Sequence, residues 1–330
     1  MTHTRACRCF ASGASTDNLA TVPPNPFRFG AAAFSATSAA QWTERARQIE
    51  SLGYSTLLIN DHPAWGSFGP FTALSAAAAA TTTLRVGCTV FTNDYRNPVM
   101  LAKEAATLDL LSDGRFELGL GAGWSKREYD QAGFDFRSPA VRVERLSEAV
   151  QILRSLWSGE TVAFTGRHYR LDGLQLAPRP TRPLHLFIGG GGKRLLSLAG
   201  HHASSVGILA RALPEGDGLD LESDTLATVS TKVSWVREAA GERFEDLELA
   251  LLFWNVVVTH SRESAAASVA AQRRLTPDQA LASPYFLLGS IDEITEQVEG
   301  LRAHFGMSYF SVFPGDVETF AAVVARLAGR

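Results

Sequence analysis

The sequence of 330 residues has few cysteines and no histidine spacing typical of a metal site. Two of its three cysteines, Cys7 and Cys9, lie near the amino terminus, and the third, Cys88, lies in a strand-like run. Such a set forms neither a disulfide framework nor a zinc site, so we expect a protein of the reducing cytoplasm. The eight histidines are dispersed with no H-x-x-x-H spacing, and we predict no bound metal.

Long apolar runs and a strong net charge are also missing. The alanine run 76–80 is far shorter than the ~18 apolar residues that indicate a membrane span. A formal net charge of −3 gives no reason to expect nucleic acid or an anionic membrane as a partner. The 45% of hydrophobic and 20% of charged residues are ordinary for a globular enzyme, and we expect a small-molecule substrate.

Residues 1–26 differ from the rest of the chain. They lack the apolar core of a secretory signal and the amphipathic helix of a transit peptide. We expect a disordered extension, or the product of an upstream start codon, followed by one folded domain over residues 27–330.

From Phe27 onward, strand-like apolar runs alternate with helical patterns. We expect strands at 27–34, 55–61, 84–92, 115–123, 184–190, 204–209, 247–259 and 308–314. We expect helices at 39–52, 70–81, 98–111, 139–157, 193–201, 224–240, 291–305 and 317–327. Eight strands that are each followed by a helix imply a parallel sheet. The predicted fold class is α/β, a closed (β/α)8 TIM barrel with insertions at its mouth; a doubly wound open sheet is the alternative.

Two stretches interrupt the alternation of strand and helix. The first, at about 161–173, alternates in polarity around Thr165-Gly166 and predicts a β-hairpin. The second, at about 262–288, is longer and less regular, and we interpret it as a lid over the barrel mouth.

Four consecutive glycines between an expected strand and an expected helix form the strongest local signal. The run Gly189–Gly192 is followed by Lys193 and Arg194. Glycine lets the backbone approach a ligand closely, and a helix amino terminus offers unpaired N–H groups to a phosphate. We interpret this stretch as a phosphate-binding loop; a tight turn with two solvated cations is the alternative.

Active sites of such barrels form at the carboxyl ends of the strands. After the second expected strand, Asp61 and His62 precede Trp65, and an imidazole there can act as a general acid or base. A hydrogen-bonded turn residue is the alternative reading of His62. After the fourth strand, Gly119, Gly121 and Gly123 carry only a weak signal, because strand packing explains such spacing equally well.

Four segments occur in a characteristic order and spacing: residues 53–62, residues 84–92 with Asn97-Pro98, residues 108–123 and residues 188–192. Together they resemble the coenzyme F420-dependent branch of the bacterial luciferase-like monooxygenase superfamily. The resemblance implies a flavin or deazaflavin at the barrel mouth, with a non-proline cis peptide at Thr89–Val90 beside its ring. It implies F420 as the cofactor, with FMN as the alternative.

The resemblance also assigns roles to individual residues. The catalytic pair would be His62, as acid or base, and Asp61, as the group that orients it. The implied cofactor contacts are Asp61, Thr89, Val90, Thr92, Gly123, Gly190, Gly191, Gly192, Lys193, Arg194 and Leu195. The apolar mouth loops suggest a substrate pocket of Trp65, Phe68 and Trp124.

One position departs from the sugar-phosphate dehydrogenases of this superfamily. Where they carry a catalytic glutamate, this chain has Trp124, and an indole cannot transfer a proton. Glucose 6-phosphate is therefore a doubtful substrate.

The predicted function is hydride transfer between F420 and a small organic substrate, by a cytoplasmic homodimer. The alternatives are an FMN-dependent monooxygenase served by a separate flavin or F420 reductase, a non-catalytic flavin carrier, and a phosphosugar isomerase.

Overall fold

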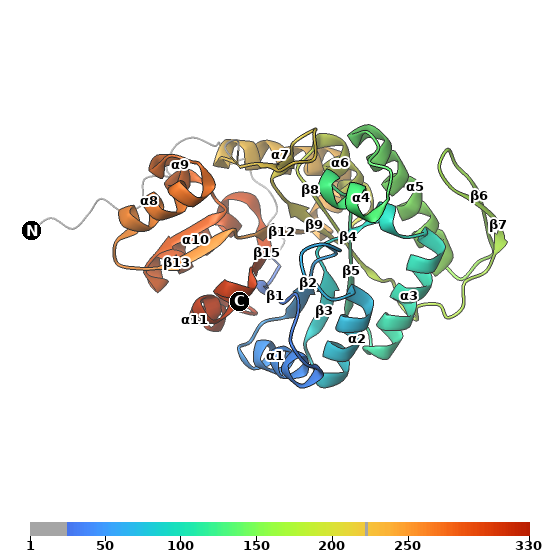
Figure 1. Ribbon diagram of the computed structural model, residues 1–330, viewed down its shortest axis with the longest axis horizontal. Helices are drawn as coiled ribbons and strands as arrows, with labels where there is room; N and C mark the ends of the chain where they lie inside the picture. Colours follow the sequence, from blue (N-terminus) through green and yellow to red (C-terminus); the bar gives the residue numbers. More distant parts are fainter. Residues whose placement is uncertain (1–24, 222–223) are drawn as a thin grey trace, which may run out of the picture.

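Eight parallel strands form a closed barrel, as predicted (Figure 1). The computed structural model describes residues 25–221 and 224–330. The barrel strands are β1 (Arg28–Ala32), β2 (Thr56–Ile59), β3 with β4 (Arg85–Cys88, Phe91–Thr92), β5 (Phe116–Gly121), β8 (His185–Gly190), β9 (Ser205–Ile208), β12 (Glu248–Leu252) and β15 (Met307–Val312). Neighbouring strands pair in the order β3-β2-β1-β15-β12-β9-β8-β5, and a pairing of β3 with β5 closes the ring. The open-sheet alternative is thereby excluded.

Helices surround the barrel. They are α1 (Ala39–Ser51), α2 (Pro70–Ala80), α3 (Pro98–Leu111), α4 (Lys126–Ala132), α5 (Pro139–Trp157), α6 (Lys193–His202), α7 (Leu226–Ala240), α10 (Ile291–Phe305) and α11 (Val317–Leu327). The Ser290 side chain caps α10 and Glu293 closes a capping box, as the Ser-x-x-Glu spacing indicates. Helix α4 was not predicted from the sequence, because its seven residues are too short for a clear apolar period.

The third barrel strand is broken where a break was expected. The peptide bond between Thr89 and Val90 is cis, and it separates β3 from β4. On the neighbouring strand, a Cβ on Gly119 would lie 1.9 Å from the carbonyl oxygen of Cys88. Gly119 therefore lets the backbone of the break approach β5, which accounts for one of the three spaced glycines.

The prediction of one strand over residues 247–259 is wrong, because two strands occupy this range. Strand β12 stays in the barrel, whereas β13 (Asn255–Val258) leaves it and pairs with β14 (Phe286–Gly289). With α8 (Arg262–Arg273) and α9 (Pro277–Ala282), these strands form an insertion with a small apolar core of its own. The insertion thus begins earlier than predicted, since a continuous apolar run does not show where a strand leaves the sheet.

The predicted hairpin is present as β6 (Val162–Thr165) and β7 (Arg170–Leu174). It lies at the opposite end of the long axis from the insertion (Figure 1). A second small hairpin, β10 (Arg211–Ala212) with β11 (Leu219–Asp220), follows β9. Residues 1–24 of the expected amino-terminal extension lie outside the described residues. Across the described part of the chain, no helix is long and apolar enough to cross a membrane.

A layer of buried charges fills the barrel at the amino-terminal ends of its strands. Arg28 of β1 forms ion pairs with Glu117 of β5 and Glu248 of β12, and Arg85 of β3 also pairs with Glu117. The hydroxyl of Tyr309 donates to Glu117 at 3.1 Å. This layer closes the end of the barrel opposite to the mouth.

Candidate active site

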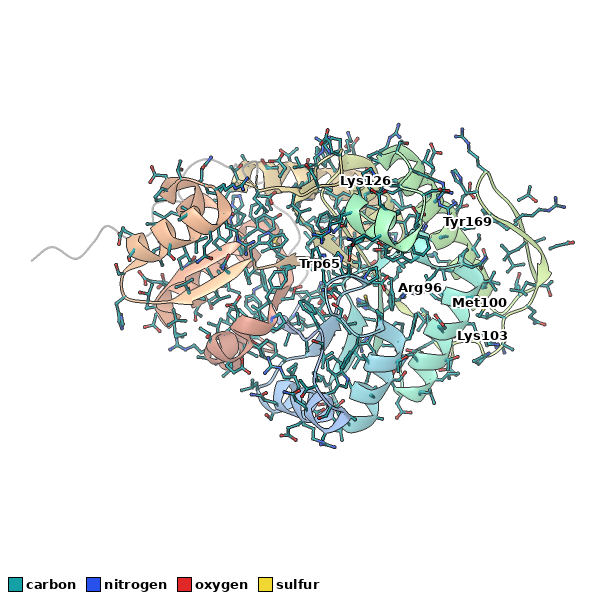
Figure 2. The ribbon with its side chains drawn as sticks, in the orientation of Figure 1. Trp65, Arg96, Met100, Lys103, Lys126 and Tyr169 are labelled. Atoms are coloured by element: carbon teal, nitrogen blue, oxygen red, sulfur yellow. The ribbon has the colours of Figure 1, made fainter. Side chains whose placement is uncertain are left out.

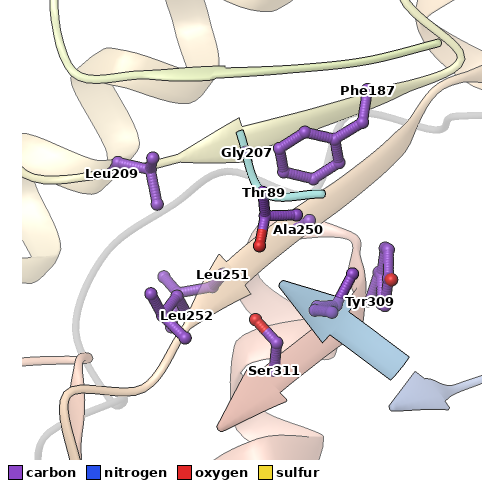
Figure 3. Close-up of a pocket in the computed structure, with 10 residues that line it drawn as sticks. Thr89, Phe187, Gly207, Leu209, Ala250, Leu251, Leu252, Tyr309 and Ser311 are labelled. Atoms are coloured by element: carbon purple, nitrogen blue, oxygen red, sulfur yellow. The ribbon is translucent and has the colours of Figure 1, made fainter. Parts of the chain in front are cut away.

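An apolar pocket opens inside the barrel, toward the carboxyl ends of the strands (Figure 3). It is lined by Leu58, Thr89, Phe187, Gly207, Leu209, Ala250, Leu251, Leu252, Tyr309 and Ser311. These residues come from five strands, β2, β8, β9, β12 and β15, from the position just after β9, and from the cis-peptide break. None of the lining residues carries a charge, so the pocket suits the flat, apolar face of a ring better than an ionic ligand.

His62 stands in the loop after β2 and is bound by a glutamate of α4. Its Nδ1 lies 2.5 Å from Oε2 of Glu128, and the other carboxylate oxygen accepts the backbone N–H of Ala64 at 3.2 Å. The Glu128 side chain is only 1% exposed. Because a carboxylate only accepts, Nδ1 carries the proton of this bond, and Nε2 is left to exchange a proton with a ligand. Within the described residues, Nε2 has no hydrogen-bond partner.

Two tryptophans enclose the His62 ring. The Trp65 indole stacks on it with ring centroids 3.8 Å apart and planes 9° apart. The Trp124 indole meets both rings edge-on, with centroids 5.9 Å from His62 and 5.8 Å from Trp65. Trp65 is 55% exposed and lies near the centre of the view in Figure 2. The structure therefore brings together three of the predicted site residues in one ring cluster.

Asp61 has a different role from the one predicted. Its two oxygens accept from the Arg96 guanidinium at 2.5 and 2.8 Å, and Oδ2 also accepts the backbone N–H of Thr92 at 3.0 Å. Glu128, not Asp61, holds His62, so the expectation that Asp61 orients the imidazole is corrected. Asp61 instead ties the loop after β2 to the segment after β4, with charge-assisted bonds that fix both loops.

Cys88 lies next to the cis peptide and is buried. Burial raises the pKa of its thiol well above the usual range, and the charge of Asp61 adds to this shift. The thiol therefore stays protonated, and the site holds no thiolate nucleophile at this position.

The glycine loop after β8 is shaped by close backbone contacts on one side and open space on the other. A Cβ on Gly191 would lie 2.6 Å from the backbone of Ala210 and Arg211, whereas one on Gly192 would meet nothing within 4 Å. Gly192 is the N-cap of α6 and has no side chain to cap the helix, so the first N–H groups of α6 are available to a ligand. These features fit an anion such as a phosphate.

Other predicted residues are placed less directly at the site. A Cβ on Gly123 would overlap the hydroxyl of Tyr129, so this glycine allows close packing. Phe68 packs edge-on against Trp42 of α1, with centroids 5.3 Å apart, and does not join the ring cluster. The Nζ atom of Lys193 lies 3.8 Å from the Oε2 atom of Glu238. Within the described residues, no group of three potential ligands could hold a metal ion.

Glu128 and Arg96 are the residues that the sequence reasoning missed. The spacing Ser125-x-x-Glu128 is typical of a capping box at the start of a helix. In the structure the Ser125 side chain makes no capping bond, and Glu128 is directed to His62 instead. The signal in the sequence was therefore a glutamate three residues after a serine, just behind a barrel strand. It could have identified Glu128 as a candidate site residue.

Comparisons with known proteins agree with this architecture. The profile of the luciferase-like monooxygenase family matches residues 25–304. An F420-dependent glucose-6-phosphate dehydrogenase of Kribbella flavida is 32% identical over 72% of this chain and 71% of its own. One of the same name from Amycolatopsis mediterranei is 30% identical over 62% of this chain and 61% of its own, so the match spans about three fifths of that relative. An F420-dependent hydroxymycolic acid dehydrogenase of Mycobacterium tuberculosis is 34% identical over 48% of this chain and 45% of its own.

Solved structures show the same fold at lower identity. The F420-dependent tetrahydromethanopterin reductase of Methanopyrus kandleri is 16% identical, with a TM-score of 0.73 over 92% of this chain and 98% of its own. An F420-dependent secondary alcohol dehydrogenase is 21% identical, with a TM-score of 0.71 over 92% of this chain and 99% of its own.

Proposed function

The chain belongs to the luciferase-like monooxygenase family, and on that premise we propose that it is an oxidoreductase that transfers a hydride between coenzyme F420 and a small organic substrate. The observation that carries the proposal is the His62–Glu128 pair in the loops after β2 and β5, at the end of the barrel toward which the apolar pocket opens. An oriented imidazole at this end of the barrel, together with a pocket for a flat ring, supplies what hydride transfer needs from the protein, a proton acceptor and a place for the ring. Relatives of 30–34% identity that are named F420-dependent support the choice of cofactor.

The residues present fit a deazaflavin with a ribityl phosphate. The pocket holds no charged side chain, and the cis peptide at Thr89–Val90 borders it through Thr89. The open space over Gly192, at the start of α6, suits the phosphate, with Lys193 and Arg194 close in sequence. When bound, F420 supplies a deazaflavin carbon that accepts or donates a hydride.

His62 is the general acid or base of the proposed reaction. Its Nε2 takes the hydroxyl proton when an alcohol is oxidised and returns it when a carbonyl is reduced. Glu128 holds the imidazole through Nδ1 and stabilises the ring when it carries two protons. Asp61 contributes indirectly, because its bonds to Arg96 and Thr92 hold the segment that follows the cis peptide.

Titration with F420 and with FMN tests the cofactor. The purified protein would be titrated with each, oxidised and reduced, and followed by the quenching of tryptophan fluorescence. We expect micromolar or tighter binding of F420 and weaker binding of FMN. A preference for reduced FMN, with oxygen uptake, would instead indicate a monooxygenase supplied by a separate reductase, and binding of neither would refute the proposed cofactor.

Replacement of His62 by alanine tests the acid-base role. We expect kcat to fall by about 100-fold or more, since a general acid or base contributes this much, while F420 affinity stays nearly the same. The exposed His201 of α6 offers a control, and His201→Ala should keep the wild-type rate. Melting temperatures of both variants would show whether the fold is intact, and an unchanged rate in a folded His62→Ala would remove His62 from the mechanism.

We also propose that the enzyme is a cytoplasmic homodimer that associates through α3. Three large apolar side chains of this helix are exposed, Met100 at 55%, Leu110 at 39% and Leu111 at 70%. Exposed apolar patches commonly mark protein interfaces. A monomeric mass by light scattering at micromolar concentration would refute the dimer.

A further inference from the structure

We propose that Lys232 of α7 is a positioning residue for the cofactor phosphate, because it holds the backbone at the end of β9 against the glycine loop. The inference rests on the proposed function, since it concerns the same cofactor site. It is carried by the buried ion pair of Lys232 with Asp224, which the proposed reaction does not use, and by the backbone carbonyl that the lysine also binds.

Lys232 and Asp224 form an ion pair inside the protein. The Nζ atom of Lys232 lies 2.7 Å from Oδ1 of Asp224, and the two side chains are only 3% and 2% exposed. Removing two charges from water is costly, and two well-packed apolar side chains are often as stable as a buried ion pair. Stability alone is therefore a weak reason for this pair, and the other contact of Lys232 becomes informative.

The ammonium group of Lys232 also donates to the backbone carbonyl of Leu209, at 2.9 Å. Leu209 is the first residue after β9, and its own N–H donates to the carbonyl of Gly190 at 3.0 Å. The side chain of Leu209 lines the apolar pocket (Figure 3). One residue thus connects the buried lysine with the glycine loop and with the place proposed for the ring.

The segment that follows Leu209 forms one wall of the glycine loop. A Cβ on Gly191 would lie 2.6 Å from the carbonyl group of Ala210 and from the backbone nitrogen of Arg211. This backbone therefore touches Gly191, and a shift of the segment must move Gly191 or open a gap beside it. Gly192 and the first N–H groups of α6 follow directly. The position of the Leu209 carbonyl thus affects the N–H groups that we propose for the phosphate.

A second buried donor holds the same stretch of backbone. The hydroxyl of Tyr285, a residue that is 1% exposed, donates to the carbonyl of Ile208 at 3.2 Å. Tyr285 directly precedes β14 of the insertion, whereas Lys232 belongs to α7. Two elements outside the barrel sheet therefore hold two successive carbonyls, which fixes the end of β9 in one position.

Lys232 acts on the phosphate through geometry and not through its charge. The carboxylate of Asp224 balances the ammonium charge at 2.7 Å, so little net attraction to a phosphate remains. The lysine works through the Leu209 carbonyl and the glycine loop. Its loss should therefore weaken the binding of a phosphate and leave the binding of the ring nearly unchanged.

Titration with two matched ligands tests the proposal. A deazariboflavin and its phosphate ester differ only in the phosphate, and the quenching of tryptophan fluorescence gives the dissociation constant of each. In Lys232→Met we expect the gain in affinity from the phosphate to fall by about 10-fold, as for the loss of one charge-assisted hydrogen bond. The affinity for the phosphate-free compound should change by less than about 2-fold. The exposed Ser230 of the same helix gives the control Ser230→Ala, which should keep the wild-type gain.

A double variant separates positioning from stability. Lys232→Met alone leaves Asp224 buried without its partner, and we expect the melting temperature to fall by about 5 °C or more. Addition of Asp224→Val removes the unpaired carboxylate and should restore most of the melting temperature. The Leu209 carbonyl still lacks its donor in the double variant, so the gain in affinity from the phosphate should stay low.

Three results would count against the proposal. It is overturned if the folded double variant keeps the wild-type gain in affinity from the phosphate, because Lys232 would then serve stability only. It is also overturned if the wild-type protein binds the two deazaflavins equally well while it binds F420 tightly. Binding of neither deazaflavin, and of no F420, would refute the proposed function itself and this inference with it.

Discussion

A single buried carboxylate, Glu128, determines how His62 can work. It binds Nδ1 of the imidazole at 2.5 Å and also accepts the backbone N–H of Ala64. The same side chain thus fixes the ring and the turn that carries it. This arrangement resembles the use of an acidic group to hold a catalytic histidine in one tautomer in other enzymes.

The replacement Glu128→Gln tests the effect of the negative charge of Glu128, because glutamine has nearly the same shape. Glutamine still accepts from Ala64 but no longer stabilises a doubly protonated imidazole. We expect kcat to fall by about 10- to 100-fold, while the KM for F420 and the melting temperature change little. Asp130 lies on the same helix and is exposed, so Asp130→Asn is a matched control with an expected wild-type rate. A normal kcat in Glu128→Gln would show that Glu128 only supports the loop.

At the scale of elements, the loop between β8 and α6 combines two glycines with different surroundings. Gly191 faces the backbone of Ala210, and Gly192 faces open space. The first glycine is therefore needed for packing, and the second leaves room for a ligand.

Two alanine substitutions distinguish these requirements. Gly191→Ala should lower the free energy of unfolding by about 1–3 kcal/mol, because neighbouring backbone must move, and should weaken F420 binding. Gly192→Ala should leave the melting temperature unchanged, since its Cβ meets nothing within 4 Å, and should still weaken F420 binding. Wild-type affinity in both variants would place the phosphate elsewhere.

The insertion after β12 shows the limit of local patterns for elements. The apolar residues on both sides of Phe253 suggest one strand, yet β12 pairs with β9 and β15, and β13 pairs with β14. The neighbouring strands with which each segment pairs decide where one strand ends and the next begins. The capping box of α10, in contrast, depends on residues three positions apart and could be predicted.

At the scale of the whole molecule, the barrel has a charged end and an apolar mouth. Burial alone would raise the pKa of Glu117, but the positive charges of Arg28, His185 and Arg85 lower it to about 2. A carboxyl with a depressed pKa in the folded state stabilises the protein above its unfolded pKa, and this contribution is lost as the pH falls from about 4.5 to 2.

The replacement Glu117→Gln tests this layer. It leaves Arg85 without its carboxylate partner and Arg28 with Glu248 alone, and we expect the free energy of unfolding at pH 7 to fall by about 3 kcal/mol. Glu318, an exposed residue that pairs with Arg45, is the control, because Glu318→Gln should change the free energy of unfolding by less than about 1 kcal/mol. Urea unfolding at pH 7 and pH 3.5 measures the free energy of unfolding of both variants. An equal effect of the two substitutions would contradict the proposed importance of the charged layer.

The sequence by itself determined the barrel, the glycine loop and the positions of His62, Trp65 and Trp124. These follow from periodicity, turn residues and motif order. Such patterns are local along the chain and can therefore be recognised in the sequence alone. The cis bond at Thr89–Val90 was also expected, from the resemblance, and is present.

Only the tertiary structure decided which groups pair. His62 and Glu128 are 66 positions apart, and Asp61 and Arg96 are 35 apart, so their partners depend on how the loops after β2, β4 and β5 meet at the mouth. Sequence order placed Asp61 beside His62 and suggested that the two act together. In the folded protein, neighbouring residues of an extended loop point apart, and the carboxylate that reaches the imidazole comes from another strand's loop.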